Sequence, residues 1–226
     1  MLTSYTFFDM IEMIGGVTMY YIDFDNTLYE TGRLTKEVLT TFSKIIGKAQ
    51  SLNPNIVLDE LKKSFNSSID NFETFAGQLS EKFNVSPQVL QSHLKKIVLE
   101  NGSNFVFPDA LDFLKRLNKK GEKVCILTYV AQKKNLKQQS MKLAGSGILP
   151  YVDEIYNTTR LKFELEIDYK NGIFIDDSPR ELEGLYKAGA KHIIRIKKPN
   201  NTKRTSQILR IKEEIPTYEN FNDIKI

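Results

Sequence analysis

The chain has 226 residues, of which 41% are hydrophobic and 11% aromatic, and its formal net charge at pH 7 is +4. This composition supports a buried core and excludes a chain that is disordered throughout, and the length allows one α/β domain with an insertion or two small domains. No run of about 18 apolar residues occurs, so a membrane-spanning helix is not expected.

The first expected element is a buried strand that begins at Met19, where four apolar residues precede the first acidic pair. Residues 1–18 contain acidic side chains and lack the basic segment of a secretory signal, so we expect them to be an N-terminal extension. The single cysteine, Cys125, lies in an apolar run and is expected to be a core residue. One cysteine excludes an intrachain disulfide, and together these features predict a cytoplasmic protein.

A long segment with helical periodicity follows the first strand. Apolar residues recur at three- and four-residue spacing over residues 35–50, 55–65, 69–83 and 87–101. Proline at position 87, directly after a serine, is typical of the first turn of a helix. We therefore expect a helical bundle over residues 33–104, inserted between two strands of the main domain.

The rest of the chain, from residue 105, alternates between strand-like and helix-like segments. Strands are expected over residues 123–127, 152–156, 172–175 and 192–196, and helices after Pro108, over residues 132–144 and from Pro179 to Gly189. Such alternation is typical of βαβ units and predicts an α/β fold with a mostly parallel sheet. Residues 19–32 and 105–226 are thus expected to form one domain.

Polar side chains follow three of the expected strands at the point where each strand ends. Asp23 and Asp25 follow the first, Thr128 follows the second, and Asp176 with Asp177 follows a later one. Acidic residues after a strand are also common turn formers and helix caps. The agreement of three strands favours a functional site, because open parallel sheets place ligand crevices at the carboxyl ends of their strands. Carboxylates there could hold a hard cation, act as a nucleophile and move a proton.

The sequence from about Tyr20 onward resembles the haloacid dehalogenase-like hydrolase superfamily, in its capped phosphatase branch. Asp23-Phe24-Asp25-Asn26-Thr27-Leu28 is similar to the first motif of that superfamily, Leu127-Thr128 to the second, and Asp176-Asp177-Ser178 to the fourth. Lys162 is assigned as the third-motif lysine, because Lys170 lies too close to the next strand. The resemblance implies a Rossmann-like core with helices on both faces of the sheet, and residues 33–104 as a cap over the active site.

The resemblance also implies a mechanism. Asp23 would attack phosphorus and form an aspartyl-phosphate, and Asp25 would protonate the leaving alcohol and then activate water. Thr128 and Lys162 would bind the phosphoryl oxygens, with Asn26 as a further candidate for phosphate contact.

The cofactor implied by the resemblance is Mg²⁺. Its ligands would be Asp23, the backbone carbonyl of Asp25, and Asp177, with Asp176 as a direct or water-bridged ligand. Asp25 favours phosphoryl transfer, since the carbon–halogen branch of the superfamily generally lacks this second aspartate and the metal.

The leading hypothesis is a Mg²⁺-dependent phosphatase that hydrolyses a small phosphomonoester. A phosphomutase or phosphotransferase that uses the same intermediate remains an alternative, as does a non-catalytic phosphate- or partner-binding protein. Basic residues are frequent between Arg195 and Lys212, but no aromatic residues interleave with them. We expect this run to be solvated loop and strand edge, and expect neither nucleic acid nor a membrane to be a partner.

Overall fold

The computed structural model describes residues 18–65, 71–199, 210–211 and 214–226. In these residues one open sheet has the strand order β3-β2-β1-β4-β5-β6, and every pairing is parallel. The strands are β1 (Met19–Ile22), β2 (Lys123–Tyr129), β3 (Glu154–Thr158), β4 (Ile173–Asp176), β5 (His192–Ile196) and β6 (Thr217–Tyr218). After β1, the chain adds β2 and β3 on one side of it and then β4, β5 and β6 on the other side. β1 therefore lies at the switch point of the sheet, where open α/β sheets bind ligands.

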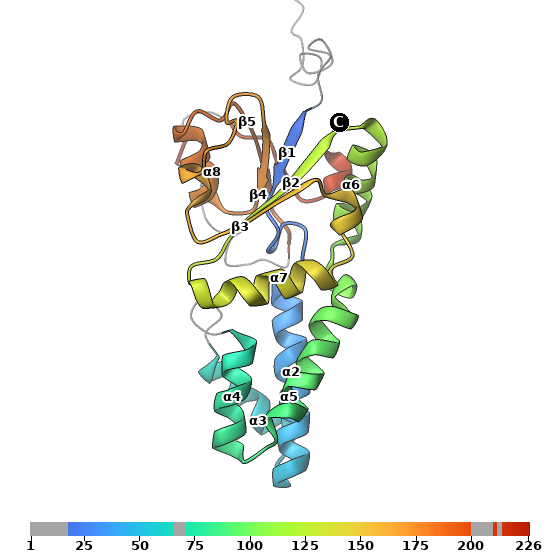
Figure 1. The fold of residues 1–226 in the computed structure, drawn as a ribbon, viewed down its shortest axis with the longest axis vertical. Coiled ribbons are helices and arrows are strands. Elements are labelled where there is room, and N and C mark those ends of the chain that lie inside the picture. The colour runs from blue at the N-terminus through green and yellow to red at the C-terminus, as the bar shows by residue number, and fades with distance from the viewer. Residues whose placement is uncertain (1–17, 66–70, 200–209, 212–213) are drawn as a thin grey trace, which may run out of the picture.

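Helices cover both faces of the sheet, as Figure 1 shows for α6 (Pro108–Lys120) and α8 (Pro179–Lys187). Alternate residues of each strand enter different apolar clusters, because successive side chains of a strand point to opposite faces. Tyr20 packs in the cluster that includes the α6 side chains, whereas Tyr21 and Cys125 pack in the cluster that includes those of α8. The predicted α/β fold is confirmed, and Cys125 is a core residue.

The segment between β1 and β2 is helical. It comprises α2 (Thr31–Gln50), α3 (Pro54–Ser64), α4 (Phe72–Phe83), α5 (Pro87–Lys95), the π-helical turn η1 (Lys96–Glu100) and the 3₁₀ turn η2 (Gly102–Phe105). These helices form a bundle beyond the carboxyl ends of the strands, and α7 (Leu136–Gly145) lies across the molecule between the bundle and the sheet (Figure 1). The four helices expected here from periodicity are all present, with boundaries that differ by a few residues.

Three differences from the sequence prediction have local causes. β2 continues two residues further, through Tyr129, because it pairs with β3 up to that residue. β3 begins two residues later than expected. The backbone N–H of Val124 donates to the Asp153 carboxylate at 2.9 Å, and not to a backbone carbonyl of a paired strand. β6 has only two residues and is defined by its pairing with Arg195 and Ile196, so no periodicity could indicate it.

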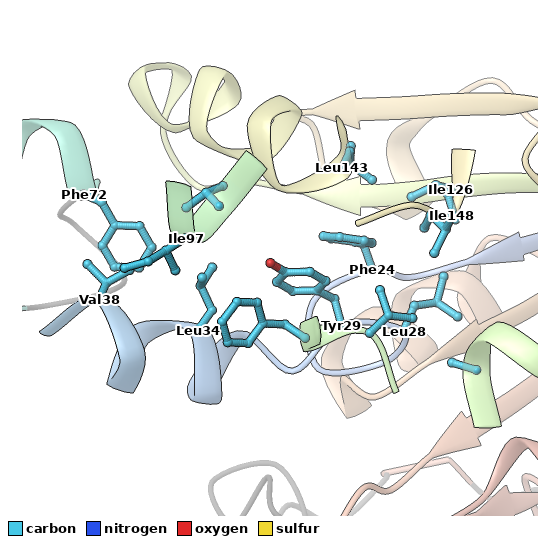
Figure 2. Packing of buried hydrophobic residues seen from close by; sticks show 14 of the residues in the cluster. Phe24, Leu28, Tyr29, Leu34, Val38, Phe72, Ile97, Ile126, Leu143 and Ile148 are labelled. Atoms are coloured by element: carbon cyan, nitrogen blue, oxygen red, sulfur yellow. The ribbon is translucent and has the colours of Figure 1, made fainter. Parts of the chain in front are cut away.

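The helical bundle and the sheet share one continuous apolar core (Figure 2). Phe24, directly after β1, stacks on Tyr29 with ring centroids 4.8 Å apart. From this pair the cluster extends to Leu34 in α2 and Ile97 in η1, and α7 adds Leu143. In this structure the insertion is therefore held to the sheet domain by buried apolar contacts, in addition to the two chain connections.

Only part of the basic run near the carboxyl end is exposed. Arg195 and Lys198 are buried, and the Lys198 ammonium contacts the Asp109 carboxylate and lies 4.8 Å from the centroid of the Phe107 ring. Residues 200–209 and 212–213 fall outside the described residues, as do residues 1–17 of the expected N-terminal extension. Among the described helices, none combines the length and apolarity that a bilayer crossing requires.

The carboxyl end of α7 touches the bundle through backbone atoms. A Cβ on Gly145 would lie 1.9 Å from the carbonyl oxygen of Val98, and one on Gly102 would lie 2.7 Å from the carbonyl oxygen of Gly145. The absence of side chains at both glycines therefore allows η1 and η2 to approach α7 closely.

Replacement of Gly145 by alanine should destabilise the protein by about 1–3 kcal/mol, because backbone cannot move aside as a flexible side chain can. The matched control is Gly77→Ala in α4, where a Cβ would meet nothing within 4 Å. There alanine should stabilise by about 0.5–1 kcal/mol through its higher helix propensity. Urea unfolding of both variants measures the difference, and equal free energies of unfolding would contradict this view of the α7 contact.

Candidate active site

The turn after β1 places the first two acidic residues. The Asp23 backbone N–H donates to the carbonyl of Ile175 at 2.9 Å, which keeps Asp23 beside β4 at the edge of the sheet. The chain then turns back, with the N–H groups of Leu28 and Tyr29 donating to the Phe24 carbonyl. Asn26 has φ of 63°, a left-handed conformation that asparagine tolerates better than most residues. The turn sends Asp25 away from Asp23 and toward α7.

Asp23 is held by two side chains. Its Oδ2 accepts from the Thr27 hydroxyl at 2.8 Å, and its Oδ1 accepts from the Lys162 ammonium at 2.5 Å. Lys162 stands in the 3₁₀ turn η5 (Lys162–Glu164), is 2% exposed, and also donates to Asp176 Oδ2 at 2.6 Å. One buried ammonium therefore joins the carboxylates that follow β1 and β4.

Asp23, Asp176 and Asp177 form a buried cluster whose ligand oxygens all lie within 4.8 Å of one another. Lys162 contacts two of these three carboxylates, and the third, Asp177, interacts electrostatically with the buried Arg195 guanidinium. Burial raises the pKa of Asp23 to about 6, because the desolvation and the repulsion from Asp176 outweigh the attraction of Lys162. Burial opposes the charge of Lys162, but the two carboxylates raise the pKa of its ammonium above its usual value.

The cluster fits a hard divalent cation. All of its donors are carboxylate oxygens, the ligands that Mg²⁺ and Ca²⁺ prefer. A cation there would also reduce the repulsion between Asp23 and Asp176 that raises the pKa of Asp23. Of the predicted metal ligands, Asp23, Asp176 and Asp177 are brought together, whereas the side chain of Asp25 points into a different set of contacts.

A cavity of about 320 Å³ opens beside these groups. It is lined by Asp23, Asp25, Tyr129, Lys162, Asp176, Asp177, Ser178, Arg180 and Glu181. All of these residues come from the sheet domain, and no described residue of α2–α5 is among them. Two residues predicted to contact phosphate, Thr128 and Asn26, are not among the lining residues either.

Asp25 and Thr128 are both bound by side chains from α7. The Gln139 amide nitrogen donates to Asp25 Oδ2 at 2.7 Å and to the Thr128 hydroxyl at 2.8 Å. The Lys142 ammonium and the Thr31 hydroxyl contact the other oxygen of Asp25. Burial alone would raise the pKa of Asp25, but the charge of Lys142 and the three hydrogen bonds outweigh it and hold this pKa below its usual value.

Sequence reasoning missed Gln139 and Lys142, which lie outside every motif used to find the site. A weak signal was present in the sequence. Gln139 is three residues after Leu136 and four residues before Leu143, so the three side chains share one face of a helix. A polar residue on the inward face of a helix needs a buried partner. Nothing in the sequence identified Asp25 and Thr128 as that partner.

The fold is shared with solved structures of low sequence identity. A protein of Burkholderia xenovorans LB400 described as a haloacid dehalogenase-like hydrolase is 18% identical, with 92% of this chain and 94% of that chain covered and a TM-score of 0.62. The HAD phosphatase of Thermococcus onnurineus is 14% identical, with 89% and 92% covered and a TM-score of 0.54. The L-2-haloacid dehalogenase of Xanthobacter autotrophicus is 11% identical, with 92% and 96% covered and a TM-score of 0.52.

No protein-family model and no curated protein matches the chain. The structural matches establish that this chain has the fold of the haloacid dehalogenase-like hydrolases, which confirms at the level of the fold the resemblance found from the motifs. Proteins with this fold are named for different reactions, so the fold alone does not select one.

Replacement of Lys162 by methionine should lower the free energy of unfolding by about 3–5 kcal/mol in metal-free buffer, because two buried carboxylates lose their shared cation. The loss should be greater at pH 7.5 than at pH 5.5, since protonation of a carboxylate relieves the repulsion. Lys170→Met is the control, as Lys170 is exposed and its substitution should change stability by less than about 0.5 kcal/mol. Urea unfolding at both pH values checks this, and similar losses in the two variants would count against the central place of Lys162.

Proposed function

We propose that this chain is a Mg²⁺-dependent phosphatase that hydrolyses a small phosphomonoester through an aspartyl-phosphate on Asp23. The observation that carries the proposal is the buried cluster of Asp23, Asp176 and Asp177 around the Lys162 ammonium, at the switch point of the sheet. The cavity of about 320 Å³ beside this cluster is near the lower end of the range for small-molecule sites, which supports a small substrate.

Asp23 is the nucleophile in this proposal. One carboxylate oxygen bonds to phosphorus while the bond from phosphorus to the leaving oxygen breaks. Lys162 contacts one oxygen of Asp23 and Thr27 donates to the other, so both groups orient the carboxylate. Lys162 also brings positive charge to the place where the phosphoryl oxygens would lie.

Asp25 moves the proton. The leaving oxygen takes a proton from Asp25, and Asp25 recovers one from the water that attacks phosphorus and frees Asp23. Because the pKa of Asp25 is held below its usual value, the carboxylate is ionised at neutral pH and is ready for the water step. Asp25 takes up the proton for the first step from solvent when substrate binds and returns one to solvent at the end of the cycle, while Lys142 contacts Asp25 and holds the carboxylate in place.

The metal site would be formed by Asp23, Asp176 and Asp177, with the backbone carbonyl of Asp25 as a further ligand. When bound, the cation supplies charge neutralisation that lets an anionic nucleophile meet an anionic phosphoryl group. The clustering of three buried carboxylates, each with an oxygen within 4.8 Å of the others, supports this assignment.

Phosphoryl transfer explains more of the site than carbon–halogen cleavage does. A departing halide needs no proton donor, so Asp25 and the contacts that hold it would have no role in dehalogenation. A buried triad of carboxylates would likewise have no role in a reaction without a metal.

Phosphate release from a panel of phosphorylated metabolites tests the proposal. Wild-type protein should release phosphate only with Mg²⁺, and Asp23→Asn should lower kcat by at least about 10³-fold because the amide oxygen is a poor nucleophile. Asp112→Asn on the exposed face of α6 is the matched control and should retain full activity. Transfer of phosphate to added alcohols instead of water would favour the phosphotransferase alternative, and no turnover of any compound would contradict the proposal.

Metal binding can be measured without turnover. Mg²⁺ at 100 times its dissociation constant should raise the free energy of unfolding by about 2.7 kcal/mol, and Asp177→Asn should remove most of this gain. The raised pKa of Asp23 means that a proton competes with the cation at low pH. Affinity for Mg²⁺ should therefore fall about tenfold for each pH unit below about 6, as measured by calorimetry. A Mg²⁺ affinity that is the same for Asp177→Asn and wild type would place the metal elsewhere.

A further inference from the structure

Two polar side chains of α7 are buried against the candidate site, and neither of them reacts in the proposed mechanism. Gln139 is 2% exposed and Lys142 is 4% exposed. Burial of an amide and an ammonium is costly unless each finds partners. Their partners are Asp25 and Thr128, the candidate proton carrier and the candidate phosphoryl-binding hydroxyl.

The Gln139 amide joins these two site residues. An ionised carboxylate only accepts hydrogen bonds, so the nitrogen of the amide must face Asp25, and its two hydrogens serve Asp25 and Thr128. Since the Thr128 oxygen accepts from Gln139, the proton of that hydroxyl points elsewhere. Thr128 is thereby left as a donor, which is the role that a phosphoryl oxygen requires.

Lys142 completes the support of Asp25. Its ammonium and the Thr31 hydroxyl contact one carboxylate oxygen while Gln139 contacts the other. Asp25 therefore has donors on both oxygens and is fixed in one orientation.

Other residues of α7 attach this helix to the helical bundle. The Lys137 ammonium pairs with the Glu73 carboxylate at 2.8 Å, and the Gln138 side chain accepts from the backbone N–H of Phe72 at 2.6 Å. At its carboxyl end, Gly145 meets the backbone of η1 and η2. One helix thus contacts the bundle and also holds two site residues.

We propose that Gln139 and Lys142 are positioning residues that fix Asp25 relative to Thr128, so that phosphoryl binding and proton transfer to the leaving group occur in one arrangement. This inference rests on the proposed function. It assigns to α7, a helix of the sheet domain, the orientation of the proton carrier. The arrangement matters most for substrates whose leaving group needs a proton, such as alkyl phosphates, and least for aryl phosphates with stable leaving groups.

The test compares two pairs of matched variants on α7. Gln139→Leu and Lys142→Met remove side chains that contact the site, and Gln138→Leu and Lys137→Met make the same replacements at residues that contact the bundle. For each protein, kcat/KM is measured with the best alkyl phosphate and with p-nitrophenyl phosphate, in Mg²⁺. Gln139→Leu and Lys142→Met should lower kcat/KM for the alkyl phosphate about 10²-fold more than for the aryl phosphate, and the two control variants should leave the ratio unchanged.

A second measurement does not require turnover or the buried charge of Lys142. Orthovanadate binding in Mg²⁺, followed by calorimetry, should be about tenfold weaker in Gln139→Leu than in wild type, because Thr128 is no longer directed, and unchanged in Gln138→Leu. An unchanged ratio of alkyl to aryl turnover together with unchanged vanadate affinity would overturn the inference while the phosphatase activity stands. If the wild-type protein turns over neither phosphate, the proposed function is overturned, and this inference with it.

Discussion

The contact of one buried ammonium with two buried carboxylates organises the site. Parallel strands bring their carboxyl ends to one edge, so the acidic residues after β1 and β4 must meet there. Lys162 stabilises this arrangement by binding both Asp23 and Asp176. With Asp177 they form a cluster of carboxylate oxygens of the kind that hard cations bind. The proposed nucleophile, the proposed cation site and the ammonium proposed to bind the phosphoryl group thus depend on the same few contacts.

The helical insertion does not line the cavity, but it affects the described site through α7 and through Thr31 of α2, which contacts Asp25. Its helices share an apolar core with the turn after β1, and Phe24 and Tyr29 lie where the two parts join (Figure 2). Next to this junction, α7 lies between the bundle and the sheet and presents Gln139 to Asp25 and Thr128. A shift of the bundle would therefore change the orientation of Asp25 through both α7 and Thr31, although no described residue of α2–α5 lines the cavity.

The positions of the acidic residues could be predicted from the sequence, because they depend only on which residues come at the end of each apolar strand. Asp23, Asp176 and Asp177 each follow an apolar strand, and parallel pairing of those strands suffices to gather them. Placing Lys162 required choosing between two lysines, and the structure brings the chosen one onto Asp23. The surroundings of Thr128 could not be predicted, because they depend on the angle at which α7 crosses the end of the sheet. That angle is fixed by packing between distant segments, including the contact of Gly145 with η1.

The two aspartates after β1 differ in environment, and the difference separates their roles. Asp25 has a cation of its own in Lys142, which keeps it ionised, whereas Asp23 shares Lys162 with Asp176 and holds a proton more readily. Two titratable groups whose pKa values are shifted in opposite directions commonly divide the nucleophilic and proton-transfer roles between them. Here desolvation and the charge of Asp176 raise the pKa of Asp23, which is the wrong direction for the nucleophilic role proposed for it. Charge neutralisation at the carboxylate cluster would lower this pKa and leave that of Asp25 under the control of Lys142, so a divalent cation would activate the nucleophile as well as stabilise the phosphoryl group.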